Sequence, residues 1–165
     1  MSMNQLQVKE SLPRVQVEKN LEASLLLLKD LSVRESLDAN YNLVGYQVAG
    51  NDEDLKKAVQ LIEQYSQPLE ARELSALLTE LHLLTKQRKE NQVSLDLAFE
   101  LYGRRLEKYP ADIVREVLSK WCDQSKWWPS WHELKEENEW RNKRGKLKDN
   151  IEAKLLNKQL KELRA

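Results

Sequence analysis

Hydrophobic residues recur at every third or fourth position along much of the chain, which is the period of an amphipathic helix. In the best-defined stretch, five leucines share one face, so we expect a core helix there: Leu74, Leu77, Leu78, Leu81 and Leu84. The same spacing and its punctuation predict helices over about 14–30, 51–65 and 69–88, one between Asn91 and Tyr109, and one that Pro110 opens and that carries Trp121 on its apolar face.

Residues 31–50 do not follow this period. We expect a short helix over Ser32–Ala39, followed by a loop, because Asn40-Tyr41-Asn42 and the glycines at 45 and 50 are typical of turns.

The C-terminal part begins at a clear boundary. After Pro129, Ser130-Trp131-His132-Glu133 has the S-x-x-E form of a capping box, which predicts a helix start. An unbroken helix over 131–163 would be about 50 Å long and would protrude from a compact domain. Gly145 or a cap at Asp149 could instead divide it. We expect residues from about 141 onward to form an amphipathic tail that finds a partner.

The composition supports a helical protein. Only four glycines and four prolines occur in 165 residues, whereas folds rich in strands need many turns. The predicted fold is an all-α multi-helix bundle with a protruding basic C-terminal helix or tail. We expect an N-terminal helix and loop (1–50), a helical core domain (51–140) and the tail (141–165). One cysteine and no apolar run of 18 residues predict a cytoplasmic protein without disulfides, signal peptide or membrane span.

The net charge of zero hides an uneven distribution. Residues 1–100 carry 11 Lys/Arg and 16 Asp/Glu, whereas residues 101–165 carry 16 and 11. The most basic stretch is residues 141–148, here called the basic segment, which has five positive charges and no negative one. It could neutralise phosphates or meet an acidic partner, and the alternative is an ordinary solvated helix face.

Candidate catalytic residues are few. The sequence has no P-loop, H-E-x-x-H, G-x-S-x-G or G-x-G-x-x-G motif. His82 fits a hydrogen-bonded residue at the edge of the core. His132 has metal-binding spacing to Glu136 but no further ligand, and Cys122 has no identifiable base. We therefore expect neither an enzyme nor a bound metal or cofactor.

All five tryptophans lie between residues 121 and 140, and three of them flank Pro129. We call residues 126–131 the tryptophan corner. In one interpretation the corner folds back and seals the end of the bundle. In the other it is an exposed aromatic platform beside Lys126, either a protein-binding hot spot or a stacking surface for single-stranded nucleic acid.

A longer pattern surrounds the corner. Tyr102–Val114, Trp121 and Ser125–Leu134 fit Y-x3-L-x2-Y-P-x-D-x-V, then W, then S-K-[FW]-[FW]-P-[ST]-x-x-E-L. This pattern resembles small helical proteins of phages and prophages, namely the replicative-helicase loader and inhibitor family and related replisome-organiser proteins. The resemblance covers roughly residues 70–140, and residues 1–60 have no recognised counterpart.

The resemblance implies an ATP-independent DNA-replication accessory protein whose tail engages a hexameric replicative helicase. The alternatives are a single-stranded nucleic-acid binder, with a salt slope of about −3.5 for five phosphate contacts, and a phage-encoded inhibitor of a host protein. Any of these could be a homodimer through the tail. The residues that we expect to bind a partner or nucleic acid are Lys126, Trp127, Trp128, Trp131, Trp140, Arg141, Lys143, Arg144, Lys146, Lys148, Ile151 and Leu155.

Overall fold

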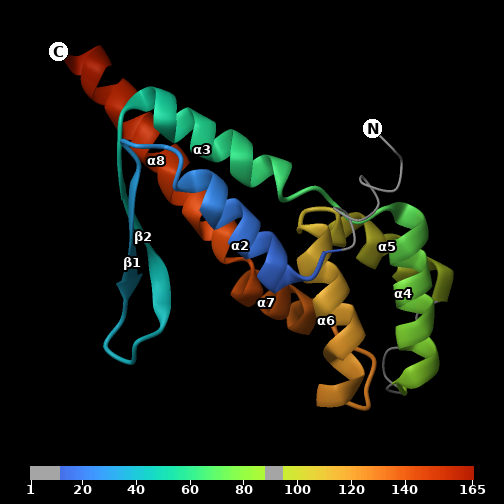
Figure 1. Ribbon diagram of the computed structural model, residues 1–165. Coiled ribbons are helices and arrows are strands. Elements are labelled where there is room, and N and C mark those ends of the chain that lie inside the picture. Colours follow the sequence, from blue (N-terminus) through green and yellow to red (C-terminus); the bar gives the residue numbers. More distant parts are fainter. Residues whose placement is uncertain (1–11, 88–94) are drawn as a thin grey trace. The chain divides into compact units, whose positions relative to one another are not determined.

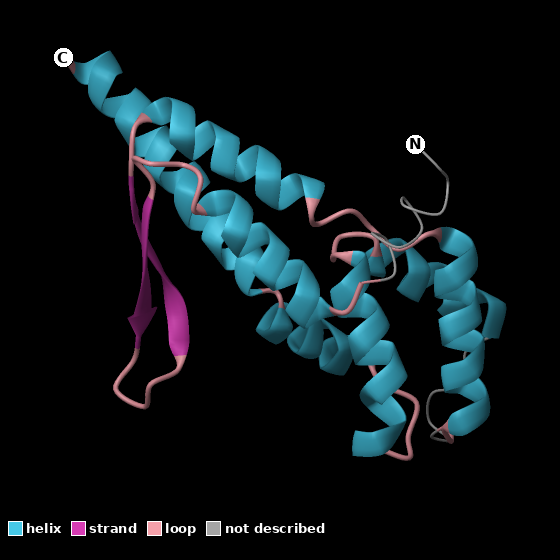
Figure 2. Ribbon diagram, viewed as in Figure 1, coloured by secondary structure: helices cyan, strands magenta, loops and turns pink. Residues whose placement is uncertain are grey.

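The computed structural model describes residues 12–87 and 95–165 of the chain (Figure 1). This part of the chain is mainly helical, with one two-stranded antiparallel sheet (Figure 2). Its elements, in order, are α2 (Arg14–Leu25), β1 (Ser32–Leu37), β2 (Leu43–Ala49), α3 (Asp52–Gln64), α4 (Ala71–Leu84), α5 (Leu95–Leu106), α6 (Ala111–Gln124), α7 (Trp131–Arg141) and α8 (Lys143–Arg164).

The chain divides into two compact units, and the division differs from the expected one. The first, here the corner unit, contains the described residues up to Gln16 and from Ser66 to Asn142. The second, here the hairpin unit, contains residues 17–65 and 143–165. The residues expected to form a separate tail therefore belong largely to the same unit as the N-terminal part of the chain.

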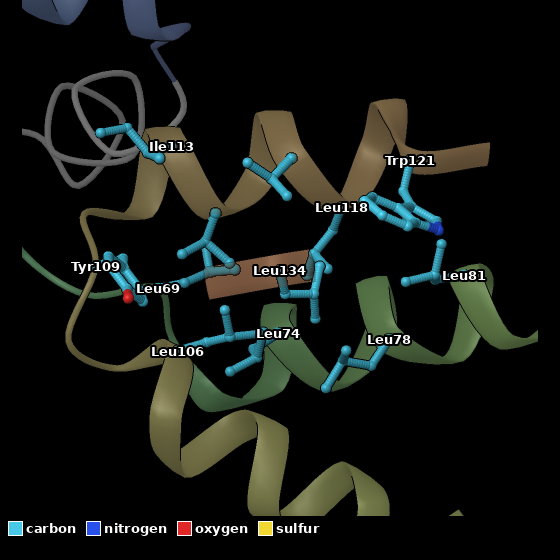
Figure 3. Close-up of a cluster of buried hydrophobic side chains, with 12 residues drawn as sticks. Leu69, Leu74, Leu78, Leu81, Leu106, Tyr109, Ile113, Leu118, Trp121 and Leu134 are labelled. Carbon is cyan, nitrogen blue, oxygen red and sulfur yellow. The ribbon is translucent and has the colours of Figure 1, made fainter. Parts of the chain in front are cut away.

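The corner unit has a core of hydrophobic residues, mostly leucines and aromatic residues, from α4, α5, α6, α7 and the segments next to them (Figure 3). The predicted leucine stripe is confirmed at Leu74, Leu78 and Leu81, and Trp121 is buried as expected. Leu84, at the end of α4, is instead exposed. The helix stops there and not at residue 88, and residues 88–94 lie outside the described part.

Two predicted helix starts are confirmed in detail. The Asn51 side chain accepts a hydrogen bond from the Asp54 amide at 2.7 Å and caps α3. Ser130 and Glu133 form the reciprocal capping box at the start of α7. The C-terminal helix is two helices, and the break lies at Asn142 rather than at Gly145 or Asp149.

The hairpin unit is built around α3 and α8. Its core is a cluster of buried hydrophobic residues from α2, α3 and α8, namely Leu21, Leu55, Ala58, Ile62, Leu147 and Ile151. Because α8 contributes two of these, its first half is a core element and not a protruding tail. The tail prediction is corrected here for residues 143–151.

The all-α prediction is wrong for residues 32–49, which form the β1–β2 hairpin. The turn lies at the asparagines as expected, but residues 43–49 of the predicted loop form β2, and the short helix expected over Ser32–Ala39 is β1 with the first residues of the turn. There the Asp38 carboxylate accepts hydrogen bonds from the Asn40 and Asn42 amides at 2.8 and 2.9 Å, and Tyr41 has a positive φ of 62°. The flanking strands are short, and their residues pair across the hairpin with residues beyond the reach of a helical turn, so a helical period was a poor guide to them.

Candidate binding surfaces at the tryptophan corner and on helix α8

The tryptophan corner is tied to the end of α4 by two backbone hydrogen bonds. The Lys86 amide donates to the Lys126 carbonyl at 2.7 Å, and the Trp128 amide donates to the Lys86 carbonyl at 2.8 Å. Together they form a short parallel bridge between Lys86 and Trp127. The chain after α6 is therefore fixed by backbone hydrogen bonds to the segment that follows α4.

Two side chains of the corner unit each donate to a further carbonyl of the corner. The Trp121 indole Nε1 donates to the Trp127 carbonyl at 2.8 Å. The Tyr102 hydroxyl donates to the Pro129 carbonyl at 2.8 Å, and burial raises the pKa of Tyr102. Both donors lie on helices that build the same unit, so the corner conformation is specified by its own core.

The rings of two corner tryptophans contact other aromatic residues of the corner unit. Trp128 lies nearly parallel to Phe99 and Tyr102, with ring centroids 6.0 and 5.7 Å apart, and edge-on to His82 at 5.8 Å. Trp131 packs at 6.0 Å from Tyr102. These contacts support the interpretation in which the corner seals the unit, because a ring face covered by protein is not available to a nucleic-acid base.

Trp127 and Trp140 are placed differently. Trp127 is half-buried, with the exposed Lys126 ammonium 5.3 Å from its ring centroid. Trp140 on α7 is 67% exposed, and the Arg141 guanidinium lies 5.4 Å from its ring centroid. Of the five tryptophans, Trp140 presents most of its surface to solvent.

The first cation of the basic segment is engaged within the corner unit. Arg141 is buried and pairs with Glu137 on its own helix, and its Nε lies 3.4 Å from a Glu116 carboxylate oxygen. Glu116 also accepts hydrogen bonds from Arg14 at 2.5 Å and from Lys120 at 3.1 Å. Burial alone would raise the pKa of Glu116, but the bonds from Arg14 and Lys120 outweigh it and lower the pKa below its ordinary value of 4.5.

The lowered pKa of Glu116 makes the stability of the corner unit depend on pH. A carboxyl group with a depressed folded-state pKa stabilises the fold above its ordinary pKa, and this contribution is lost as the pH falls through the folded-state value. We expect Glu116→Gln to cost about 1–2 kcal/mol near neutral pH and to flatten the loss of stability in acid. Urea unfolding followed by tryptophan fluorescence at several pH values measures both, and equal pH dependence in the two proteins would contradict the assignment.

The remaining cations of the basic segment lie in the hairpin unit. Arg144 is buried and donates to the Tyr65 carbonyl at 3.0 Å, at the end of α3. The Lys148 ammonium lies 3.3 Å from Glu63. Lys146 is half-buried, and Lys143 is exposed. The basic segment is therefore not a continuous exposed strip of phosphate-binding cations.

The acidic and basic halves of the sequence meet inside the hairpin unit. The Lys158 ammonium donates to the Gly50 carbonyl at 2.7 Å and lies 3.2 Å from the Asp52 carboxylate, in the acidic first turn of α3. With the contacts of Arg144 and Lys148 at the other end, these bonds place α3 antiparallel to α8. Three basic residues of α8 therefore serve packing between these two helices.

Two predicted binding residues on α8 are not displayed at the surface. Ile151 is completely buried in the core of the hairpin unit, and Leu155 is half-buried against it. Both were predicted to face a partner, and for Ile151 this is corrected because α3 and α2 already cover it. The exposed row lies on the next face of the helix, at Leu156, Leu160 and Leu163. The rotation of the apolar stripe after Leu155 was its signal in the sequence.

The residues considered for chemistry do not form a reactive group in the described part of the chain. Among the described residues there is no cluster of three or more metal-ligating side chains. His132 and Glu136 are 2.9 Å apart and both exposed, and Cys122 is half-buried. His82 was expected to be hydrogen-bonded, but its buried Nδ1 has no partner among the described residues because Phe99 and Trp128 surround the ring.

Comparison of the chain with protein-family models, with curated proteins and with solved structures finds no match. Within residues 12–87 and 95–165, no helix is both long and apolar enough to cross a membrane.

Proposed function

We propose that this protein is a non-catalytic adaptor that binds a protein partner through the C-terminal half of α8. One observation carries the proposal: Leu156, Leu160 and Leu163 are 56%, 43% and 82% exposed. They are spaced i, i+4 and i+7, so they form a single apolar row on the helix. Such a row is the recognition element that amphipathic helices insert into apolar grooves.

The charge of this helix end specifies the kind of groove. Residues 152–165 contain four Lys/Arg and two Glu, and Arg164 borders the leucine row. A partner groove with an apolar floor and an acidic rim would match both features. The resemblance of residues 70–140 to phage helicase loaders and inhibitors makes a hexameric replicative helicase the partner to test first.

The contacts of the predicted site favour a protein partner over single-stranded nucleic acid. Arg141 and Arg144 are buried and engaged with protein acceptors. Trp128 and Trp131 pack against aromatic residues of their own unit. A stacking platform needs open ring faces and free cations, and these four residues supply neither.

The test is co-elution with the replicative helicase of the cell in which the gene is expressed. We expect the wild-type chain to shift the helicase on a sizing column, and the triple variant Leu156→Ser, Leu160→Ser, Leu163→Ser to lose at least about 100-fold in affinity, from roughly 1 kcal/mol per lost leucine contact. Because the three leucines are exposed, far-ultraviolet circular dichroism should show an unchanged helix content.

The matched control is Leu97→Ser with Leu101→Ser, which removes two exposed leucines from α5 of the corner unit. This variant should bind like the wild type. If the wild type does not shift the helicase, the partner assignment is wrong. If the α8 variant binds as tightly as the wild type, the surface assignment is wrong. A helicase unwinding assay then separates a loader from an inhibitor.

A further inference from the structure

The β1–β2 hairpin has one covered side and one open side. Strand β2 lies against α8: the Tyr46 amide donates to Asn150 Oδ1 at 2.9 Å, and a Cβ added at Gly45 would lie 3.2 Å from the same atom. Strand β1 is the outer strand (Figures 1 and 2). Five of its six residues are exposed, and only Ser36 is half-buried.

The bond to Asn150 determines which backbone groups of β1 face outward. Residues of an antiparallel pair alternate between hydrogen-bonded and non-hydrogen-bonded positions. Because the Tyr46 amide donates to α8, it points away from β1, and the Tyr46–Glu35 pair is non-hydrogen-bonded. The N–H and C=O of Glu35 therefore point away from β2, as do those of Val33 two residues earlier. No described residue bonds to these groups.

We propose that this edge of β1 is a docking site for an extended segment of a partner protein, which adds to the sheet as an antiparallel third strand. Directly opposed residues on neighbouring strands lie within about 5 Å, and opposite charges there are favourable. Arg34 and Glu35 thus select an acidic and a basic residue respectively. Val33 and Leu37, 40% and 49% exposed, select apolar residues on either side.

From its N-terminal to its C-terminal end, the partner segment therefore has five residues that are apolar, polar, basic, acidic and apolar in turn. Its outward backbone groups would bond to those of Val33 and Glu35, as in other proteins that bind peptides by strand addition. This surface is made of β1 alone and shares no residue with the leucine row of α8.

A second copy of this chain does not fit the same edge. Two β1 strands related by a two-fold axis can pair only where the backbone groups that point away from β2 in one copy, such as those of Val33 and Glu35, lie opposite the same kind of groups in the other copy. The two such registers with the greatest overlap set Arg34 against Arg34 or Glu35 against Glu35 of the other copy. Like charges directly opposite destabilise a strand pair. Pairing of β1 with β1 of a second copy is therefore unfavourable, whereas pairing with a strand of complementary charge is favoured.

The experiment uses two synthetic peptides of the same composition. The matched peptide, Thr-Val-Thr-Lys-Glu-Val-Thr, places Lys opposite Glu35 and Glu opposite Arg34. The swapped peptide, Thr-Val-Thr-Glu-Lys-Val-Thr, places like charges opposite both. We expect the full chain to bind the matched peptide at least about 5-fold more tightly, from two charge pairs reversed in sign. Amide exchange at Val33 and Glu35 should slow on binding.

Two variants make the test independent of any one substitution. The charge-reversed chain, Arg34→Glu with Glu35→Arg, should prefer the swapped peptide. Glu35→Pro removes an outward N–H without removing an inward one, and should abolish binding while the Tyr46 amide stays protected. The α8 triple serine variant should bind the matched peptide normally, which separates this proposal from the helicase proposal.

Three results would overturn the proposal. The first is equal affinity for the two peptides. The second is unchanged hydrogen exchange of the Glu35 amide at millimolar peptide. The third is slower exchange of that amide when the protein concentration is raised without peptide. The last would show that a second copy occupies the edge.

Discussion

Ile151→Ala is expected to lower the free energy of unfolding of the hairpin unit by about 2–5 kcal/mol, the usual cost of truncating a buried isoleucine. The Ile151 side chain is fully buried among residues of α2 and α3. The substitution removes three methyl or methylene groups from a closed site and leaves a cavity. A residue on a solvated tail would show no such cost.

The control is Leu156→Ala, five residues later on the same helix. Leu156 is 56% exposed, so its truncation should change stability by less than about 0.5 kcal/mol. Urea unfolding followed by far-ultraviolet circular dichroism, together with amide exchange in α3 and α8, measures both variants. Equal effects of the two substitutions would contradict the assignment of the first half of α8 to the core.

Trp121→Ala is expected to cost the corner unit about 3–5 kcal/mol, as for other buried aromatic residues. Trp121 is 5% exposed, and its ring fills the space between α6 and α4 (Figure 3). The substitution also leaves the Trp127 carbonyl without its indole donor, which adds the cost of an unsatisfied group. The corner itself should loosen, so exchange of the Lys86 and Trp128 amides should speed up.

Trp140→Ala is the matched control, because it removes the same side chain from an exposed position on α7. We expect a change below about 0.5 kcal/mol. All five tryptophans lie in the corner unit, so fluorescence reports the unfolding of that unit in both variants. A small effect of Trp121→Ala would show that the corner is not held by this residue.

Burial divides the residues that were predicted to bind a partner into two groups. Ile151, Arg144 and Arg141 are buried in their own units, whereas Trp140 and Lys143 are exposed. A surface search guided by the sequence alone would have substituted both kinds of residue together. Loss of binding would then be confused with loss of fold.

Some of the basic residues near the C-terminus also contact residues of their own unit. The excess of basic residues near the C-terminus suggested a surface for phosphates or for an acidic partner. In the hairpin unit, Lys148 and Lys158 instead face Glu63 and Asp52 of α3. Exposed pairs of this kind contribute little stability each, but they favour one register and direction of the two helices.

Local sequence determined the helices and the starts of α3 and α7, but not the ends of α4 and α7. Asn51, Ser130 and Glu133 cap helices through bonds that span three residues, and the leucines of α4 follow a period that needs no knowledge of the rest of the chain. Such interactions can be read directly, because both partners lie within one turn of the backbone. The turn at Asp38 is local in the same sense.

Only the tertiary structure decided which residues are surface and which are core in the C-terminal part. The burial of Ile151 and Arg144 depends on α3, about ninety positions away in the chain, and the hairpin depends on pairing between its strands and on Asn150. The hydrophobic period of a helix does not predict which distant helix will cover each of its faces. The sequence placed an amphipathic helix over these residues, and its packing against α3 determined which of its leucines are buried and which stay exposed.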